Sequence, residues 1–353
     1  MSRRFILFAL LTLPVWAQEY RMAVVGLVHS HVWGHLDKMV KGHPARLVGV
    51  AETIPELVAE AKKRGVPENL FYSDYKKMLN ETKPNIVWAF VENNRHLEIA
   101  QECAPRGIHI MFEKPLASSY KDAVAIRDLA AKNNVRVMSN YQMAWWPAQY
   151  AAKAQADSGA LGKVWRLHGI VGHGGPGYPE GLNKYFFDWL TDPVKNGAGA
   201  LVDFGCYNAL WSLWYLGMPD SVYATTNRLQ PERFPKVEDS AVIVLHYPNG
   251  VGIFEASWDL PRSYQDLEVF GRDGSVYMTE RRVEVRKKNG TPEKVEFPAL
   301  APDAAEPIAA MIAAIQSGKP VQGLTGLDIN VDVTRIMDAA KESVRAGRAV
   351  AVK

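Results

Sequence analysis

The chain has 353 residues, a length that suits two domains better than a single ordinary core. Hydrophobic residues make up 48% of it and charged residues 22%, which is ordinary globular composition. The formal net charge is only +3, and no basic run or aromatic-interleaved stripe is present, so nucleic acid is not expected as a partner.

Residues 1–17 have the layout of a secretory signal peptide. Arg3 and Arg4 form a short positive region, an apolar run follows, and Val15 and Ala17 offer the small side chains of a cleavage site. The run is too short to cross a hydrocarbon core of ~30 Å as a permanent helix. We therefore expect an exported, periplasmic protein with no membrane span after cleavage. A buried first helix or strand is the alternative.

Residues 20–140 alternate apolar runs with helical segments. The predicted strands are Met22–Gly26, Arg46–Ala51, Ile86–Val91, His109–Phe112 and Val135–Ser139. The predicted helices are Pro55–Arg64, Leu97–Arg106 and Tyr120–Asn133. Such alternation favours a doubly wound parallel sheet with helices on both faces, which is an α/β Rossmann domain.

The remainder of the chain has a different pattern. Two helices, Ala148–Asp157 and Leu201–Leu216, precede a run of predicted strands: Ser221–Asn227, Ser240–Tyr247, Gly250–Ser257, Asp266–Gly271, Ser275–Thr279 and Arg282–Arg286. Hairpin signals at 248–250 and 272–274 join neighbouring strands. We expect an α+β domain over 141–325 with a large, mostly antiparallel open sheet. Because one face of such a sheet is commonly left for a partner subunit, a homo-oligomer (dimer or tetramer) is expected. A last helix within 326–353 is expected to pack back on the Rossmann domain.

The loop after the first strand reads Gly26-Leu27-Val28-His29-Ser30-His31. A dinucleotide fingerprint has glycine at the first, third and sixth of these positions, and only the first is present. Backbone N–H groups at the start of the following helix can still hold a diphosphate. Val28 places a branched side chain where the diphosphate comes close, which leaves open a Rossmann-shaped domain that has lost its cofactor.

Glu52 ends the second predicted strand. A carboxylate at this place accepts hydrogen bonds from the adenosine ribose and repels a 2′-phosphate. This residue therefore favours NAD over NADP. Its alternative role, an exposed cap of the next helix, is compatible with the first.

Four segments resemble the glucose–fructose oxidoreductase / inositol dehydrogenase (Gfo/Idh/MocA) family. The stretch 109–117 contains Glu113-Lys114-Pro115, similar to the family's EKP signature after a strand. The stretch 199–207 resembles the family's G-G-x-L-x-D-x-G-x-H segment. The shorter stretches 72–75 and 93–96 resemble two further family motifs. The resemblance covers about residues 21–345.

The resemblance implies a reaction site formed by Lys114, Asp203 and Tyr207. Tyr207 stands where most members have histidine, although glucose–fructose oxidoreductase also has tyrosine there. The EKP bond is commonly cis in the family, which implies a cis Lys114–Pro115 peptide. Together with the loop after the first strand, the resemblance gives these expected cofactor-binding residues: Gly26, Val28, His29, Ser30, His31, Glu52, Asn93, Asn94, His96 and Glu113.

Removing a hydride from a carbinol also requires a base for the hydroxyl proton. A phenol titrates near ~10, and the Lys114 ammonium is expected to lower the pKa of Tyr207. Asp203 would keep Lys114 charged or bind a second hydroxyl. The alternative for Tyr207 is a core aromatic on its helix.

Further residues are candidates for lining the substrate pocket. They are Trp145, Trp146, His173 in a glycine-rich loop, and Tyr185. His29 and His31 have an i, i+2 spacing that offers no third ligand, so no metal site is expected. Cys103 and Cys206 are expected to be free, buried thiols.

These observations predict an exported NAD(P)-dependent oxidoreductase acting on a CH–OH group of a carbohydrate (a sugar, polyol or glycoside). The expected cofactor is NAD rather than NADP, because of Glu52. Two alternatives stay open: a redox-neutral, glycoside-cleaving enzyme that retains its NAD, and a non-catalytic sugar-binding protein on a degenerate Rossmann frame.

Overall fold

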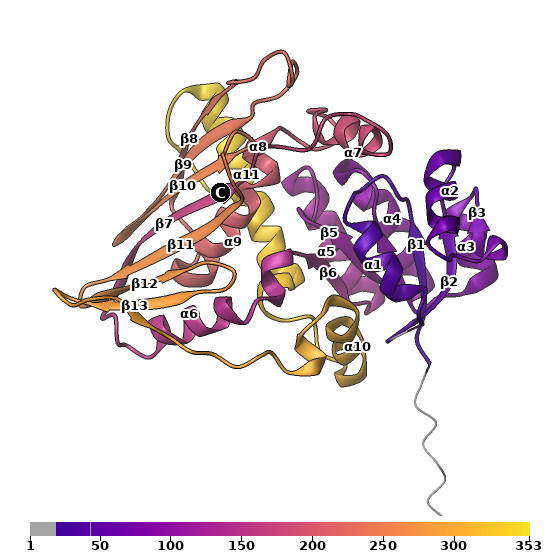
Figure 1. Ribbon diagram of the computed structural model, residues 1–353, viewed down its shortest axis with the longest axis horizontal. Coiled ribbons are helices and arrows are strands. Elements are labelled where there is room, and N and C mark those ends of the chain that lie inside the picture. The colour runs from indigo at the N-terminus through magenta and orange to yellow at the C-terminus, as the bar shows by residue number, and fades with distance from the viewer. Residues whose placement is uncertain (1–18, 43) are drawn as a thin grey trace, which may run out of the picture.

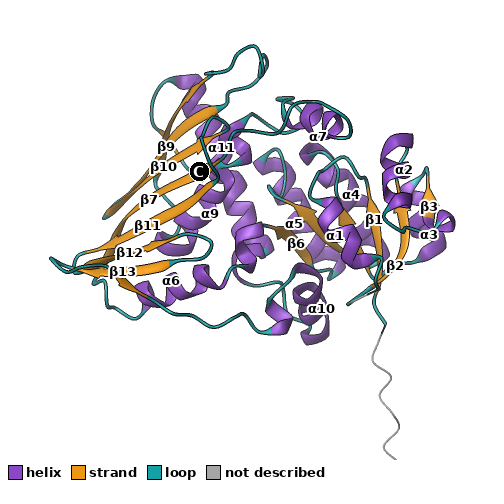
Figure 2. Cartoon of the chain, viewed as in Figure 1, coloured by secondary structure: helices purple, strands orange, loops and turns teal. Residues whose placement is uncertain are grey.

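A computed structural model describes residues 19–42 and 44–353 of the protein. It contains a six-stranded parallel sheet in the N-terminal part and a nine-stranded mixed sheet at the other end of the molecule (Figure 1). Helices fill the space between the two sheets (Figure 2). The predicted fold class is therefore confirmed. The expected signal peptide, residues 1–17, lies outside the described residues, so export stays a prediction.

The N-terminal sheet has the strand order β3-β2-β1-β4-β5-β6, and its paired strands are all parallel. The strands are β1 (Arg21–Val25), β2 (Arg46–Ala51), β3 (Phe71–Tyr72), β4 (Ile86–Ala89), β5 (His109–Glu113) and β6 (Val137–Asn140). The order reverses between β1 and β4. In open α/β sheets the ligand crevice lies at such a switch point, beyond the carboxyl ends of the strands.

Helices bury both faces of this sheet, which explains its nearly continuous apolar strands. Met22 and Val24 of β1 pack toward α1, α2 and α10, whereas Ala23 and Val25 pack toward α3, α4 and α5. The helices are α1 (Val32–Met39), α2 (Pro55–Lys63), α3 (Tyr75–Thr82), α4 (His96–Cys103), α5 (Tyr120–Asn133) and α10 (Pro307–Ser317).

The second sheet has the order β14-β13-β12-β11-β7-β10-β9-β8-β15. Its strands are β7 (Val164–Gly172), β8 (Ser221–Asn227), β9 (Ser240–Tyr247), β10 (Gly250–Ser257), β11 (Tyr264–Gly271), β12 (Gly274–Met278), β13 (Val283–Lys287), β14 (Glu293–Lys294) and β15 (Val350–Ala351). Among the described strands of this second sheet, only β7 and β10 pair in parallel. Both predicted hairpins are present, between β9 and β10 and between β11 and β12.

Helices α6 (Pro147–Asp157), α9 (Gly205–Leu216) and α11 (Leu327–Ala346) pack on the face of this sheet that looks toward the first one (Figure 1). The last of these, α11, also lies against α5 of the N-terminal part. Among the described residues, no helix combines the length and apolar character needed to cross a membrane. Cys103 and Cys206 are both free and buried, as predicted.

Several elements differ from the prediction, and two of the differences lie in the C-terminal part near the site. The single helix expected over 201–216 is split at Phe204 into α8 (Ala200–Asp203) and α9, because Phe204 has a φ of −106°, away from the usual helical value, although its ψ of −26° keeps it in the αR region. The central strand β7 was not predicted. Gly169 interrupts its β pattern, and the structure gives the reason: a Cβ there would lie 2.9 Å from the Phe254 ring on the neighbouring strand.

Candidate active site

The carboxyl ends of the parallel strands bring most of the predicted site residues to one edge of the N-terminal sheet. Gly26 follows β1, Glu52 follows β2, and Glu113 ends β5 with Lys114 next to it. Asp203 lies on α8 and Tyr207 on α9, both in the other part of the molecule. The edge of one sheet and the helices of the other therefore form the walls of one crevice.

The first turn of the crevice requires glycine at position 26. Gly26 has φ +77°, and a Cβ there would lie 2.6 Å from Val91 Cγ1 and 3.1 Å from the Phe90 carbonyl oxygen. Gly26 N–H donates to the Ala51 carbonyl at 2.9 Å, which ties the start of the turn to the neighbouring strand β2. This is the tight turn that a dinucleotide loop needs after its first strand.

Glu52 faces this turn rather than only capping a helix. Its Oε2 accepts from Leu27 N–H at 2.8 Å, and its Oε1 accepts from Thr53 N–H and Ile54 N–H at 2.7 and 2.9 Å. Gly26, Val28 and Glu52 line a cavity of about 260 Å³. The two roles expected for Glu52 are thus combined in one carboxylate.

Val28 lies between this cavity and a second one. Its side chain is partly buried against the apolar cores of both parts of the molecule. Its carbonyl oxygen accepts a 3.3 Å hydrogen bond from Trp189 Nε1, on α7 (Asn183–Leu190). Its neighbours His29 and Ser30 line the second cavity, of about 250 Å³. The loop segment 28–30 therefore separates two cavities of similar size.

Lys114 and Asp203 form a buried ion pair in the second cavity. Both side chains are 7% exposed, and Lys114 Nζ donates to Asp203 Oδ1 and, at 3.1 Å, to the Asp203 carbonyl oxygen. The break between α8 and α9 leaves that carbonyl available. Trp258 Nε1 donates to the other carboxylate oxygen at 2.9 Å. The Lys114–Pro115 peptide is cis, as predicted.

The pair is ionised in the folded protein. Burial alone would lower the pKa of Lys114, but the charge and hydrogen bond of Asp203, together with Tyr207 and Cys206, raise that pKa above its ordinary value. Burial alone would raise the pKa of Asp203, but the Lys114 ammonium lowers it below the ordinary value. At neutral pH, Lys114 is therefore a charged hydrogen-bond donor.

The predicted effect of Lys114 on Tyr207 is present, but burial has the larger effect on the pKa of the phenol. Tyr207 is buried, and burial raises the pKa of its phenol above the ordinary value, although the Lys114 ammonium acts in the opposite direction. The ammonium lies 5.4 Å from the centre of the Tyr207 ring. Tyr207 is thus protonated at neutral pH, and its phenol can donate a hydrogen bond but is a poor proton acceptor.

His173 supplies a neutral imidazole in the same cavity. It follows β7 and lines the cavity together with Lys114, Asp203 and Tyr207. Burial lowers its pKa below the ordinary value, although the Asp203 carboxylate raises it in part. The glycine-rich loop that carries it is held in place, because Arg233 Nη1 donates to the Gly174 carbonyl at 3.0 Å. His173 is therefore the side chain here best suited to accept a proton.

Two polar residues of the cavity were missed in the sequence. Gln142 follows β6, and its position after a parallel strand was a signal that could have found it. Gln265 is the second residue of β11 and had no local signal, because the fold alone brings this strand to the cavity.

Several predicted residues lie outside the two cavities. Trp145 donates from Nε1 to Asn140 Oδ1 at 2.9 Å, while Trp146 lines an adjoining cavity that also contains His173. Tyr185 lies with its ring 4.6 Å from the Lys184 ammonium. Asn93 and Asn94 follow β4 and donate hydrogen bonds to Asn196 and Lys195 of the other part of the molecule. His96 stacks on Phe112 within the N-terminal part, and Glu113 lies beside the second cavity without lining it.

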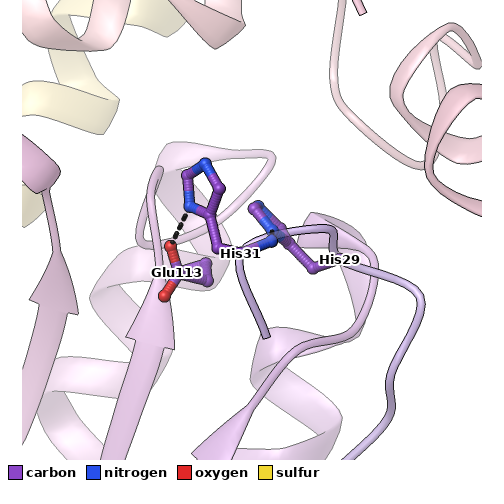
Figure 3. A group of neighbouring side chains, drawn as sticks. All are labelled: His29, His31 and Glu113. Atoms are coloured by element: carbon purple, nitrogen blue, oxygen red, sulfur yellow. Dashed lines mark hydrogen bonds and ion pairs between the residues drawn. The ribbon is translucent and has the colours of Figure 1, made fainter. Parts of the chain in front are cut away.

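His29, His31 and Glu113 form a compact cluster beside the cavity (Figure 3). His31 Nδ1 lies 2.9 Å from Glu113 Oε2, and the rings of the two histidines are 4.5 Å apart. Burial and the neighbouring His31 lower the pKa of His29 well below its ordinary value, so it is neutral. Burial would raise the pKa of Glu113, but the hydrogen bond and charge of His31 lower it to about 2.

The residues present fit a bound dinucleotide. The turn at Gly26 has no room for a Cβ, and Glu52 is placed to accept from a ribose in the first cavity. The second cavity holds the charged and polar side chains around Lys114. A dinucleotide that spans both cavities crosses the segment 28–30, where the next helix begins.

Comparisons with known proteins agree with this arrangement. A model described as "Oxidoreductase family, NAD-binding Rossmann fold" matches residues 20–141, and a model of the GFO/IDH/MocA C-terminal domain matches residues 150–277. Levoglucosan dehydrogenase from Pseudarthrobacter phenanthrenivorans is 28% identical over 74% of this chain and 73% of its own length. D-xylose 1-dehydrogenase (NADP(+)) 2 from Haloferax volcanii is 26% identical over 83% of this chain and 87% of its own length.

Two solved structures show the same fold. An aldose–aldose oxidoreductase from Caulobacter crescentus, complexed with glycerol, superposes with a TM-score of 0.80 at 21% identity, over 95% of this chain and all of that one. A levoglucosan dehydrogenase in complex with NADH and levoglucosan gives a TM-score of 0.78 at 23% identity, over 95% of this chain and all of that one.

Proposed function

Because the chain belongs to the Gfo/Idh/MocA family of NAD-binding oxidoreductases, we propose that it transfers a hydride between NAD and a CH–OH carbon of a sugar, polyol or glycoside. One observation carries this proposal. The second cavity gathers an ammonium, a phenol and a neutral imidazole next to the dinucleotide loop, in Lys114, Tyr207 and His173. The names of the similar sugar dehydrogenases support the substrate class.

NAD is proposed as the cofactor rather than NADP. Glu52 presents an ionisable carboxylate to the first cavity and is held there by the backbone of the turn. It would accept hydrogen bonds from the ribose and repel a 2′-phosphate. Backbone N–H groups of the loop that leads into α1 would hold the diphosphate, in the field of a helix N-terminus that no carboxylate caps.

The side chains of the second cavity have different roles in the proposed reaction: two hold the substrate oxygen and one accepts its proton. When bound, the nicotinamide supplies the hydride acceptor for oxidation or the donor for reduction. Lys114 and Tyr207 donate hydrogen bonds to the substrate oxygen and hold it in place, since both carry their protons at neutral pH. His173 accepts the hydroxyl proton while the carbon loses its hydride, so an alcohol becomes a carbonyl.

The first experiment is a spectrophotometric assay of nicotinamide reduction with NAD and a panel of aldoses, inositols and glycosides. Replacement Lys114→Ala is expected to abolish the activity found with any of them, because the ammonium contacts the reacting oxygen. Lys294→Ala is the matched control, since this lysine is exposed and pairs with Glu296. Full activity in Lys114→Ala would defeat the assignment.

The proton acceptor is tested separately. His173→Asn is expected to lower kcat by about 10²–10⁴-fold, the usual contribution of a general base. It is also expected to remove the acidic limb of the pH profile of kcat, because that limb reports protonation of the imidazole. A variant that keeps this limb would assign the proton to another group.

A further inference from the structure

We propose that His29, His31 and Glu113 form a binding site for a divalent transition-metal ion such as Zn²⁺. One potential ligand atom of each residue lies within 4.8 Å of those of the other two (Figure 3). The sequence offered no third ligand near the two histidines. The fold supplies it from β5, 82 residues after His31. This inference goes beyond the proposed hydride transfer and does not depend on it.

The donor set suits a transition metal. Two imidazole nitrogens and one carboxylate oxygen favour Zn²⁺, Fe²⁺ or Co²⁺ over Mg²⁺ or Ca²⁺, which prefer oxygen ligands alone. Bonds of about 2.0–2.2 Å place the ligand atoms of a four-coordinate ion about 3.4 Å apart. The His31–Glu113 separation of 2.9 Å is already within that reach. The other pairs of ligand atoms lie within 4.8 Å of each other, so binding an ion would shorten them by at most about 1.4 Å.

The charge of the cluster also favours a cation. Glu113 is fully buried, and His31 is the only basic side chain in salt-bridge contact with it in the described chain. Its sequence neighbour Lys114 is paired with Asp203 instead. A buried carboxylate without a permanent cationic partner is costly, and a metal ion is one of the usual solutions.

Neighbouring groups orient the proposed ligands. Asn140 Nδ2 donates to Glu113 Oε1 at 2.9 Å, and Trp145 Nε1 in turn fixes the Asn140 amide. The His29 ring is held by Phe186 and Trp189, at 5.2 and 5.4 Å between ring centres. Such supporting contacts are typical of protein metal sites.

The ion would be reachable from the cavity. His29 and His31 both line the cavity that contains Lys114, so three protein ligands leave a fourth position open on that side. A water molecule or a substrate hydroxyl would take this position. The proposed site is thus an open one and not a closed structural site.

The test is a titration of untagged, chelator-treated protein with Co²⁺, followed by its visible absorption, and with Zn²⁺, followed by calorimetry. We expect one ion per chain and a visible band typical of low-coordinate Co²⁺. His31→Ala and Glu113→Gln are each expected to weaken binding at least tenfold. His168→Ala is the matched control, because this exposed histidine also lies near a glutamate, 4.0 Å from Glu255. It is expected to bind as the wild type does.

Asn140→Ala keeps all three ligands and is expected to weaken binding less than loss of a ligand does, which provides a readout even if Glu113→Gln fails to fold. Absence of Co²⁺ absorption and of Zn²⁺ heat in the wild type would overturn the proposal. So would unchanged binding in a folded His31→Ala variant. Neither readout uses turnover, so a protein that binds metal but oxidises no sugar would refute only the proposed function.

Discussion

Replacement Asp203→Asn isolates a buried charge with almost no change in shape. Lys114 and Asp203 are each 7% exposed, so the variant leaves an ammonium without its counter-charge inside the crevice. The asparagine oxygen can still accept from Trp258 Nε1, which keeps that hydrogen bond. Breaking one side of a buried pair costs about 3–5 kcal/mol of the free energy of unfolding.

This loss of unfolding free energy corresponds to an expected fall in the melting temperature, Tm. An unfolding entropy of about 2.1 cal/mol/K per residue gives roughly 0.7 kcal/mol per kelvin for the whole chain, so Tm is expected to fall by about 4–7 °C if the chain unfolds as one unit. The double variant Lys114→Met/Asp203→Asn removes the unpaired charge and is expected to recover most of this loss. The assay is thermal unfolding followed by circular dichroism at pH 7.

The same variant has a defined pH dependence. In the wild type the folded pKa of Lys114 is raised, so its contribution is present below the ordinary value of ~10.4 and is lost as pH rises through the folded value. In Asp203→Asn, burial without a counter-charge lowers the folded pKa instead. The unfolded state then binds more protons, so the variant should become more stable as pH rises toward ~10. An unchanged Tm, or a double variant less stable than the single one, would refute this reasoning.

Three further outcomes are expected. Gly26→Ala forces a side chain into a backbone at φ +77° and against Val91, so urea unfolding should show a loss of stability of at least about 1–2 kcal/mol. Calorimetry should show weaker NAD binding, and normal NAD affinity would contradict the proposed crevice. Glu52→Ala should weaken NAD binding about tenfold and NADP binding less, since the removed carboxylate would no longer repel the 2′-phosphate; an unchanged preference would show that another group discriminates. Burial lowers the pKa of His96 to about 4, so the unfolded state binds more protons below pH 6.5 and the free energy of unfolding should fall between pH 6.5 and 4. His96→Asn should remove up to about 3 kcal/mol of that fall. An identical pH profile in the variant would be inconsistent with a neutral buried imidazole.

Local pattern was sufficient for most of the architecture. The boundaries of β2, α5, β8, β9 and β10 agree with the prediction, because apolar periodicity and turn residues act over a few neighbours along the chain. The prediction failed where a contact between distant parts of the chain set the local backbone conformation. In β7, Gly169 leaves room for the Phe254 ring of the next strand. The break at Phe204 coincides with the contact between Asp203 and Lys114.

The sequence by itself determined the two kinds of sheet, the turn at Gly26, and the motifs that contain Lys114 and Asp203. Only the tertiary structure decided the chemical state of the site. Burial outweighs the ammonium at Tyr207 and keeps its proton in place, and a strand two positions away in the sheet brings Glu113 to the histidines. Both effects depend on which groups exclude water and which charges meet, and these are contacts between residues far apart in the chain that no local pattern encodes.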